Sequence, residues 1–171
     1  YKRQHIYRNP VQVLHSFKKL EVKNKEKFES QNRFSILNVN ILDLFSDEIE
    51  MFPFLKNKQI LEDYNSSSDY YKKILLLYCF NEKIFEEKIK KSKSLYYQIS
   101  YRQLKNEPEM FEYILKQLNL TKVSDSLSRK KSGTDWTSNI CVEPPLSTTK
   151  VKALLEVFQL RKHLELVEKD S

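Results

Sequence analysis

The sequence contains a single glycine in 171 residues, and this scarcity excludes several common ligand sites. A Walker-type phosphate loop and a dinucleotide-binding turn both need glycines at fixed positions, so neither is present. The two cysteines, Cys79 and Cys141, are far apart and lack metal-ligand spacing. We therefore expect two reduced thiols in the core, a reducing compartment and no metal site. The lack of any long uncharged apolar run argues against a membrane span.

The composition is that of one domain with a substantial core, because 40% of the residues are hydrophobic and 12% are aromatic. The net charge of +7 and a pI of about 9.2 indicate an anionic partner. Charge alone does not choose between nucleic acid, an acidic protein and a phosphorylated small molecule. Lysines on solvated helix faces would give the same composition.

Hydrophobic periodicity predicts an α/β fold with few parallel strands and predominantly helical content, in a single domain spanning residues 1–171. Two β-prone runs are each followed by an amphipathic helix, which is the pattern of parallel strands with crossover connections. The predicted elements are a strand ending at Tyr7, a helix from Pro10 to about residue 24, short helices and loops over 23–69 with a polar turn at 65–68, a long helix over 69–91, a strand over 95–101, a helix capped by Asn106 and ending near 119, a loop over 121–146 and one final helix containing Val151 and Phe158.

The first strand-to-helix junction, residues 8–16 (RNPVQVLHS), has the residue types of an anion site. Arg8 stands at the strand end and Ser16 lies on the second turn of the helix that Pro10 begins, where charge and hydrogen bonds can hold a phosphate. The spacing resembles the Arg-Asn/Asp-Pro, two residues, Val, two residues, Ser signature of the sulfotransferase superfamily. In that family the Arg and Ser bind the 3′-phosphate of the sulfuryl donor 3′-phosphoadenosine 5′-phosphosulfate (PAPS). The resemblance implies these roles for Arg8 and Ser16.

The second junction, residues 96–120, is similar to the family's strand, its Tyr-Glu-Asp-Leu-Lys-x-x-Pro turn and the helix that ends in Leu-Gly-Leu. Tyr101 matches the Tyr that contacts the donor's adenine in cytosolic members. Arg102 and Gln103 replace the usual Glu and Asp, and Asn119 replaces the Gly. A core aromatic on a strand is the alternative interpretation of Tyr101.

A third stretch, residues 129–136 (RKKSGTDW), resembles the cytosolic Arg-Lys-Gly-x-x-Gly-Asp-Trp segment, which wraps the donor's 3′-phosphate. The resemblance implies that Arg129, Lys130 and the Lys131 backbone amide bind the donor. Lys131 and Thr134 occupy the positions of the two family glycines, and a side chain hinders the approach of an amide to phosphate. A solvated basic loop is the alternative.

The resemblance implies the C-terminal portion of a P-loop-like sulfotransferase fold, with residues 20–94 forming a variable substrate or lid region. Such an enzyme moves a sulfuryl group from PAPS to a hydroxyl or amine of a small-molecule acceptor. The family's phosphosulfate loop and catalytic base precede the matched region, so we expect the catalytic residues upstream of residue 1 and no activity from this chain alone. His5, His15 and His163 do not match the base and receive no catalytic role.

We expect a cytoplasmic protein that binds neither nucleic acid nor membranes, although the sequons at Asn65 and Asn119 leave a Golgi location open. A carbohydrate or tyrosyl-protein sulfotransferase of the secretory pathway is thus one alternative. The other is a basic helical interaction module without enzymatic function, which would bind RNA or an acidic protein. The basic residues are spread over several segments and no RNA-binding signature occurs, which argues against the module.

Overall fold

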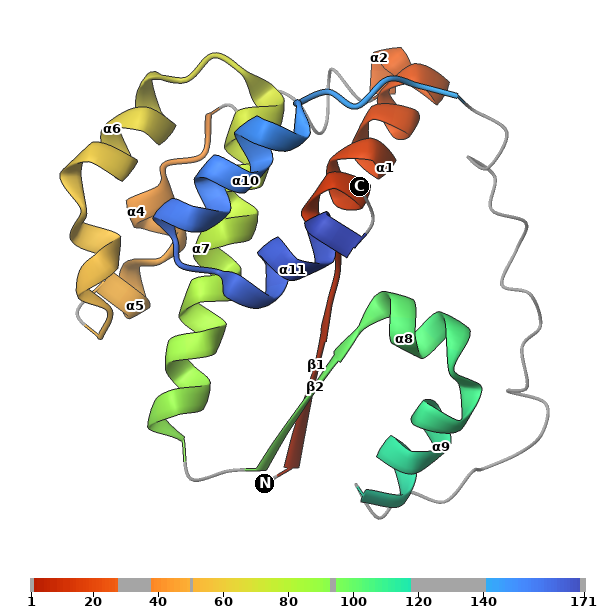
Figure 1. Cartoon of the computed structure of the whole chain (residues 1–171). Helices are drawn as coiled ribbons and strands as arrows, with labels where there is room; N and C mark the ends of the chain where they lie inside the picture. Colours follow the sequence, from red (N-terminus) through yellow and green to blue (C-terminus); the bar gives the residue numbers. More distant parts are fainter. Residues whose placement is uncertain (1, 28–37, 50, 93–94, 118–140, 170–171) are drawn as a thin grey trace. The chain divides into compact units, whose positions relative to one another are not determined.

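The computed structural model describes residues 2–27, 38–49, 51–92, 95–117 and 141–169 (Figure 1). Its contacts divide the chain into two compact units, which we call unit 1 (Tyr1–Arg8 and Ser92–Asn139) and unit 2 (Asn9–Lys91 and Ile140–Ser171). Helices predominate in the described ranges. In chain order the elements are β1 (Lys2–Tyr7), α1 (Pro10–Lys23), α2 (Lys25–Lys27), α4 (Ile41–Leu44), α5 (Ser46–Ile49), the 3₁₀ helix η2 (Pro53–Lys56), α6 (Lys58–Ser66), α7 (Tyr70–Lys91), β2 (Leu95–Ser100), α8 (Tyr101–Asn106), α9 (Pro108–Gln117), α10 (Thr148–Val157) and α11 (Arg161–Lys169).

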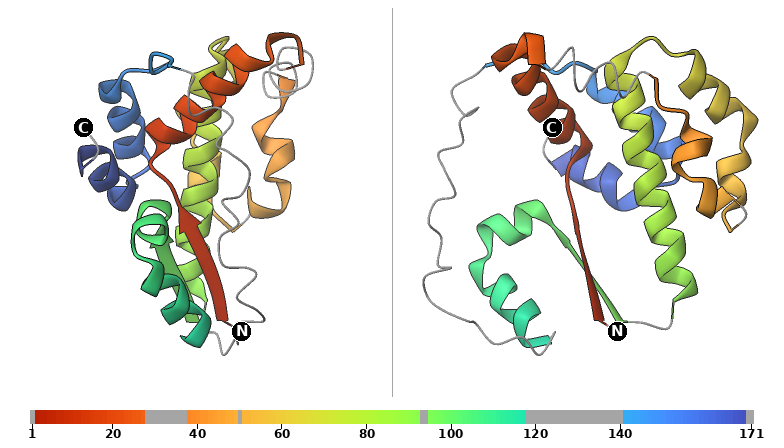
Figure 2. Two further views of the ribbon diagram at one scale, coloured as in Figure 1. Left: turned by 90° about the vertical axis from the view of Figure 1, so that its right-hand side faces the viewer. Right: turned by 180° about the vertical axis from the view of Figure 1, so that it is seen from behind.

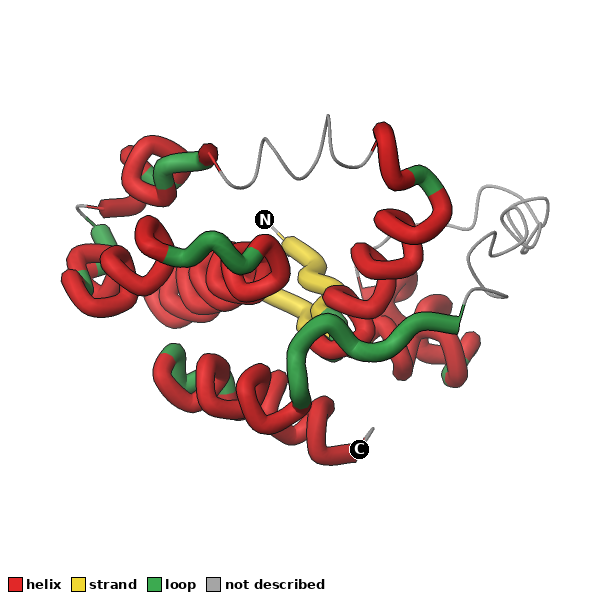
Figure 3. Tube along the Cα trace, turned by 90° about the horizontal axis from the view of Figure 1, so that it is seen from above, coloured by secondary structure: helices red, strands yellow, loops and turns green. Residues whose placement is uncertain are grey.

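Unit 1 contains a parallel pair of strands, β1 and β2, which confirms the predicted parallel pairing (Figures 1 and 3). The register runs without a bulge from Lys2 opposite Leu95 to Tyr7 opposite Ser100. Both strands therefore end at the same edge, and the residues that follow them become neighbours.

The connection after β2 differs from the predicted one. We expected a strand through Tyr101 and a helix capped by Asn106, but β2 ends at Ser100 and α8 begins at once. Ser100 and Gln103 form a capping box, in which each side chain accepts a hydrogen bond from the other residue's backbone N–H. Asn106 is the last residue of α8, and α9 begins at Pro108, where a missing N–H costs a helix nothing.

Unit 2 is a helical assembly around α7, which contacts α1, α6 and α10 (Figure 2). The predicted long helix is confirmed, and Asp69 begins it by accepting hydrogen bonds from the amides of Tyr71 and Lys72. Phe80 is fully buried on α7, and its ring lies against the rings of Phe45, Phe54 and Phe158. The predicted polar turn over 65–68 is shorter than expected, because α6 continues to Ser66.

The final helix predicted from Val151 is in fact two helices, α10 and α11. Gln159 has a left-handed backbone (φ 57°), its N–H bonds to the Glu156 carbonyl, and the Leu160 N–H bonds to the Leu155 carbonyl. This pair of bonds is a Schellman motif, which ends α10. Such a motif usually has an apolar contact between the two residues joined by the longer bond, here Leu155 and Leu160, and both are fully buried. The turn uses Gln where glycine is usual, so no glycine marked it in the sequence.

The two cysteines occupy different environments, so the expectation of two core thiols is wrong for one of them. Both are free; Cys79 is buried on α7 and Cys141 is exposed. Burial, together with the nearby Glu82 carboxylate, raises the pKa of the Cys79 thiol far above its usual range, which makes it unreactive. None of the helices in the described ranges combines the length and apolar character that crossing a membrane requires.

Candidate anion site at the strand ends

Arg8 and Tyr101 meet in unit 1 at the carboxyl ends of the two strands. Each residue directly follows its strand, and the pairing of Tyr7 with Ser100 places them side by side. The guanidinium carbon of Arg8 lies 3.9 Å from the centroid of the Tyr101 ring. This is a close cation–π contact, worth about 0.5–1 kcal/mol at an exposed position. Two residues that the sequence singled out in separate motifs are thus brought together.

The geometry suits recognition of an anion that carries a flat ring. Both Arg8 and Tyr101 are exposed, and 40% of the Tyr101 surface remains accessible. The alternative interpretation of Tyr101 as a core aromatic on a strand is therefore wrong. Stacking on the ring restricts the Arg8 side chain, and a guanidinium held in one orientation loses less entropy when it binds a phosphate.

The capping box explains how Tyr101 is oriented, and sequence reasoning missed it. The Ser100 backbone N–H donates to Gln103 Oε1 at 3.2 Å, and the Gln103 N–H donates to Ser100 Oγ at 3.1 Å. These bonds fix the first turn of α8, where Tyr101 is the first helical residue. The signal was present as Ser-x-x-Gln, one of the capping-box spacings. Gln103 therefore takes part, through its side chain and its backbone N–H, in both capping hydrogen bonds of this turn.

The remaining residues of the first motif belong to unit 2, where Asn9 is structural. Asn9 is 5% exposed, its Oδ1 accepts from the Val11 N–H at 2.9 Å, and its Nδ2 donates to the Leu166 carbonyl at 3.2 Å. Ser16 is exposed on the second turn of α1, and its hydroxyl donates to the Gln12 carbonyl at 2.9 Å. A phosphate would receive that proton only after rotation of the Ser16 hydroxyl.

Arg129, Lys130 and Lys131, the third predicted group, lie outside the described residues. Nearly all of the net positive charge of the chain nevertheless falls in the unit that contains them. Unit 1 has 11 Lys and Arg residues against 5 Asp and Glu residues, a net charge of +6, whereas unit 2 has 19 against 18, a net charge of +1. The net charge from which an anionic partner is expected is therefore concentrated in unit 1.

Two of the histidines make contacts within unit 2 that account for them structurally. His15 Nε2 lies 2.8 Å from the Val142 carbonyl oxygen, which ties α1 to the segment before α10. His163 is buried on α11, with Nε2 3.1 Å from Glu82 Oε2 on α7. No cluster of three or more His, Cys, Asp or Glu side chains suited to a metal ion occurs among the described residues.

Comparison of the chain with protein families, with curated proteins and with solved structures finds no match.

Proposed function

We propose that this chain is the donor-binding part of a sulfotransferase, which transfers a sulfuryl group from PAPS to a hydroxyl or amine of a small-molecule acceptor. The observation that supports the proposal most is the contact between Arg8 and Tyr101. The resemblance assigns Arg8 to the donor's 3′-phosphate and Tyr101 to its adenine, two parts of one nucleotide. A nucleotide that bridges them requires the two side chains to be neighbours, and they lie 3.9 Å apart, from guanidinium carbon to ring centroid.

In this proposal the described residues position the donor, and the sulfuryl transfer itself is assigned to no residue among them. Arg8 provides a fixed charge with parallel N–H donors for phosphate oxygens, and Tyr101 provides an aromatic face for the base. The capping box of Ser100 and Gln103 holds Tyr101 in place. Holding a reactant in one orientation supplies much of the rate enhancement of group-transfer enzymes.

The test is calorimetric titration of the protein with 3′-phosphoadenosine 5′-phosphate, the desulfated donor. We expect Arg8→Ala to weaken binding at least tenfold, since a hydrogen bond to a charged group contributes about 1.5–3 kcal/mol. Arg8→Lys restores the charge without the paired donors and recovers only part of the affinity. Tyr101→Leu weakens binding through loss of stacking, whether or not the ligand carries a 3′-phosphate.

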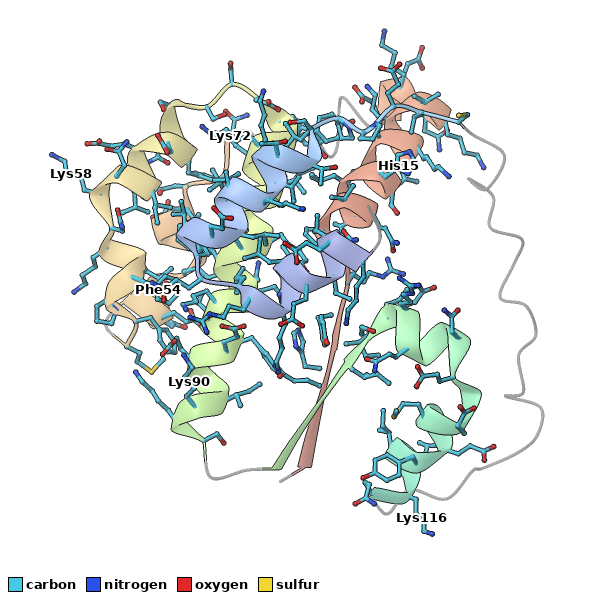
Figure 4. The ribbon with its side chains drawn as sticks, in the orientation of Figure 1. His15, Phe54, Lys58, Lys72, Lys90 and Lys116 are labelled. Atoms are coloured by element: carbon cyan, nitrogen blue, oxygen red, sulfur yellow. The ribbon has the colours of Figure 1, made fainter. Side chains whose placement is uncertain are left out.

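Two controls make the result specific. Lys116→Ala removes one positive charge from an exposed position on α9 of the same unit (Figure 4), and we expect it to leave the affinity within about twofold. Adenosine 5′-phosphate lacks the 3′-phosphate, and its weaker binding should be insensitive to Arg8→Ala. Equal affinity of wild type and Arg8→Ala for the 3′-phosphorylated nucleotide would refute the assignment of Arg8.

A further inference from the structure

Unit 2 contains a cavity of about 300 Å³ beside the N-terminal turns of α7 and α10. This volume is at the lower end of the range for small-molecule sites, roughly 300–1,000 Å³. The cavity shares no residue with the site at the strand ends. It is lined by Asp69, Lys72, Leu146, Lys150, Ala153 and Leu154.

Apolar side chains form most of the cavity wall. Leu146 is largely buried in the core, Leu154 is half-buried, and Ala153 is exposed and small. Water in contact with such a wall is displaced favourably by an apolar ligand. The methyl side chain of Ala153 leaves space that a larger residue would fill.

The charged groups of the cavity differ in their hydrogen-bond and ion-pair partners. Lys72 and Lys150 each carry an ammonium group, and neither makes an ion pair within the described part of the chain. The Asp69 carboxylate already accepts from the backbone amides of Tyr71 (2.9 Å) and Lys72 (3.2 Å). Two cations thus oppose one engaged carboxylate, which favours an anionic ligand group.

We propose that this cavity binds a small amphiphilic anion: an apolar body of roughly six to ten carbon atoms that carries one carboxylate, sulfonate or similar head group. The apolar body covers Leu146, Ala153 and Leu154, and the head group lies between the ammonium groups of Lys72 and Lys150. This site does not depend on the proposed sulfotransferase function.

The test is titration of the full chain with octanoate, followed by the methyl NMR signals of Ala153 and Leu154. Octanoate should shift these signals with saturation, and octylammonium, which has the same tail and the opposite charge, should bind at least fivefold more weakly. The double variant Lys72→Gln/Lys150→Gln should weaken octanoate binding about fivefold, the sum of two partly exposed ion pairs. Lys58→Gln is the control, because Lys58 is exposed on α6 and does not line the cavity (Figure 4).

A second variant tests the cavity rather than its charge. Ala153→Phe should fill the space and reduce octanoate binding at least tenfold, while Val157→Phe, at an exposed position one turn further along α10, should leave it unchanged. Circular dichroism of each variant checks that the helices are retained. Equal binding of octanoate and octylammonium, an unaffected Ala153→Phe variant, or the absence of saturable binding would each overturn the proposal.

Discussion

Replacement of Asn9 tests how the helix that follows β1 is held in unit 2. The Asn9 side chain makes two hydrogen bonds: Oδ1 caps α1 by accepting from the Val11 N–H, and Nδ2 donates to the Leu166 carbonyl. Leu166 belongs to the last four residues of α11, whose carbonyls lack donors within the helix. Asn9 therefore provides a hydrogen-bond partner for one N–H at the start of α1 and for one carbonyl at the end of α11.

The expected cost follows from these two bonds. Loss of an N-cap side chain destabilises by about 1 kcal/mol, and loss of a neutral hydrogen bond by about 1 kcal/mol. We therefore expect Asn9→Ala to lower the free energy of unfolding by about 2 kcal/mol. Asn9→Asp keeps the capping oxygen but loses the donor, so it should cost about 1 kcal/mol at neutral pH and less at low pH, where a protonated carboxyl donates to Leu166.

Asn57 provides a matched control, because it also caps a helix, and within the described ranges its side chain makes no such bond to a distant element. Its Oδ1 accepts from the Ile60 N–H at 3.3 Å, and its side chain is exposed. Asn57→Ala should therefore cost about 1 kcal/mol or less. Urea unfolding followed by circular dichroism gives the free energies, and hydrogen exchange of the Val11 amide reports the cap of α1 directly. If Asn9→Ala is no more destabilising than Asn57→Ala, the bond to Leu166 contributes nothing and the reasoning is wrong.

Two further predictions concern the turn after α10 and the charges of α7. Gln159→Gly should raise the free energy of unfolding by roughly 0.5–1 kcal/mol in the same urea assay, because glycine adopts the left-handed backbone without strain. A loss of stability in this variant would contradict the Schellman geometry. On α7, burial raises the pKa of Glu86, so the contribution of this residue to the free energy of unfolding is present at low pH and lost as pH rises. The hydrogen bond from Lys90 lowers the pKa of Glu87, so the contribution of Glu87 is lost as pH falls. As pH rises from about 3 to 7, the stability of Glu86→Gln should therefore increase relative to that of wild type. The stability of Glu87→Gln should decrease relative to wild type, by less than about 1 kcal/mol. If the two variants changed in the same direction with pH, the opposite pKa shifts of Glu86 and Glu87 would be refuted.

The sequence predicted those elements whose signals are local. Pro10 after a β-prone run identified α1, and apolar residues at helical spacing identified α7. It missed α8 because Tyr101 continues a β-prone run, so that propensity favoured strand where the capping box of Ser100 and Gln103 begins a helix. It missed the break after α10 because the left-handed residue is Gln159, and only glycine would have marked it.

The candidate site was predictable in its parts and not in its assembly. Arg8 and Tyr101 were each recognisable as residues at strand ends, because β-prone runs precede them. Their direct stacking depends on the register of β1 with β2, which pairs Tyr7 with Ser100. Register is set by long-range packing, and a shift of one residue would turn the side chains to opposite faces of the sheet. The local sequence around either residue carries no information about that choice.

The distribution of charge bears on which anion is the partner. Carboxylates compensate much of the charge on the lysines of α7. Lys83 lies 3.8 Å and Lys90 2.8 Å from Glu87 Oε1, and Lys88 lies 2.8 Å from Glu48 Oε1. RNA binding requires uncompensated charge along an extended surface, because each neutralised phosphate contributes separately to affinity. The excess charge belongs instead to unit 1, which also contains the stacked Arg8 and Tyr101. A ligand with concentrated negative charge and one aromatic base matches that combination, and we infer that a phosphorylated nucleotide fits it better than a nucleic acid does.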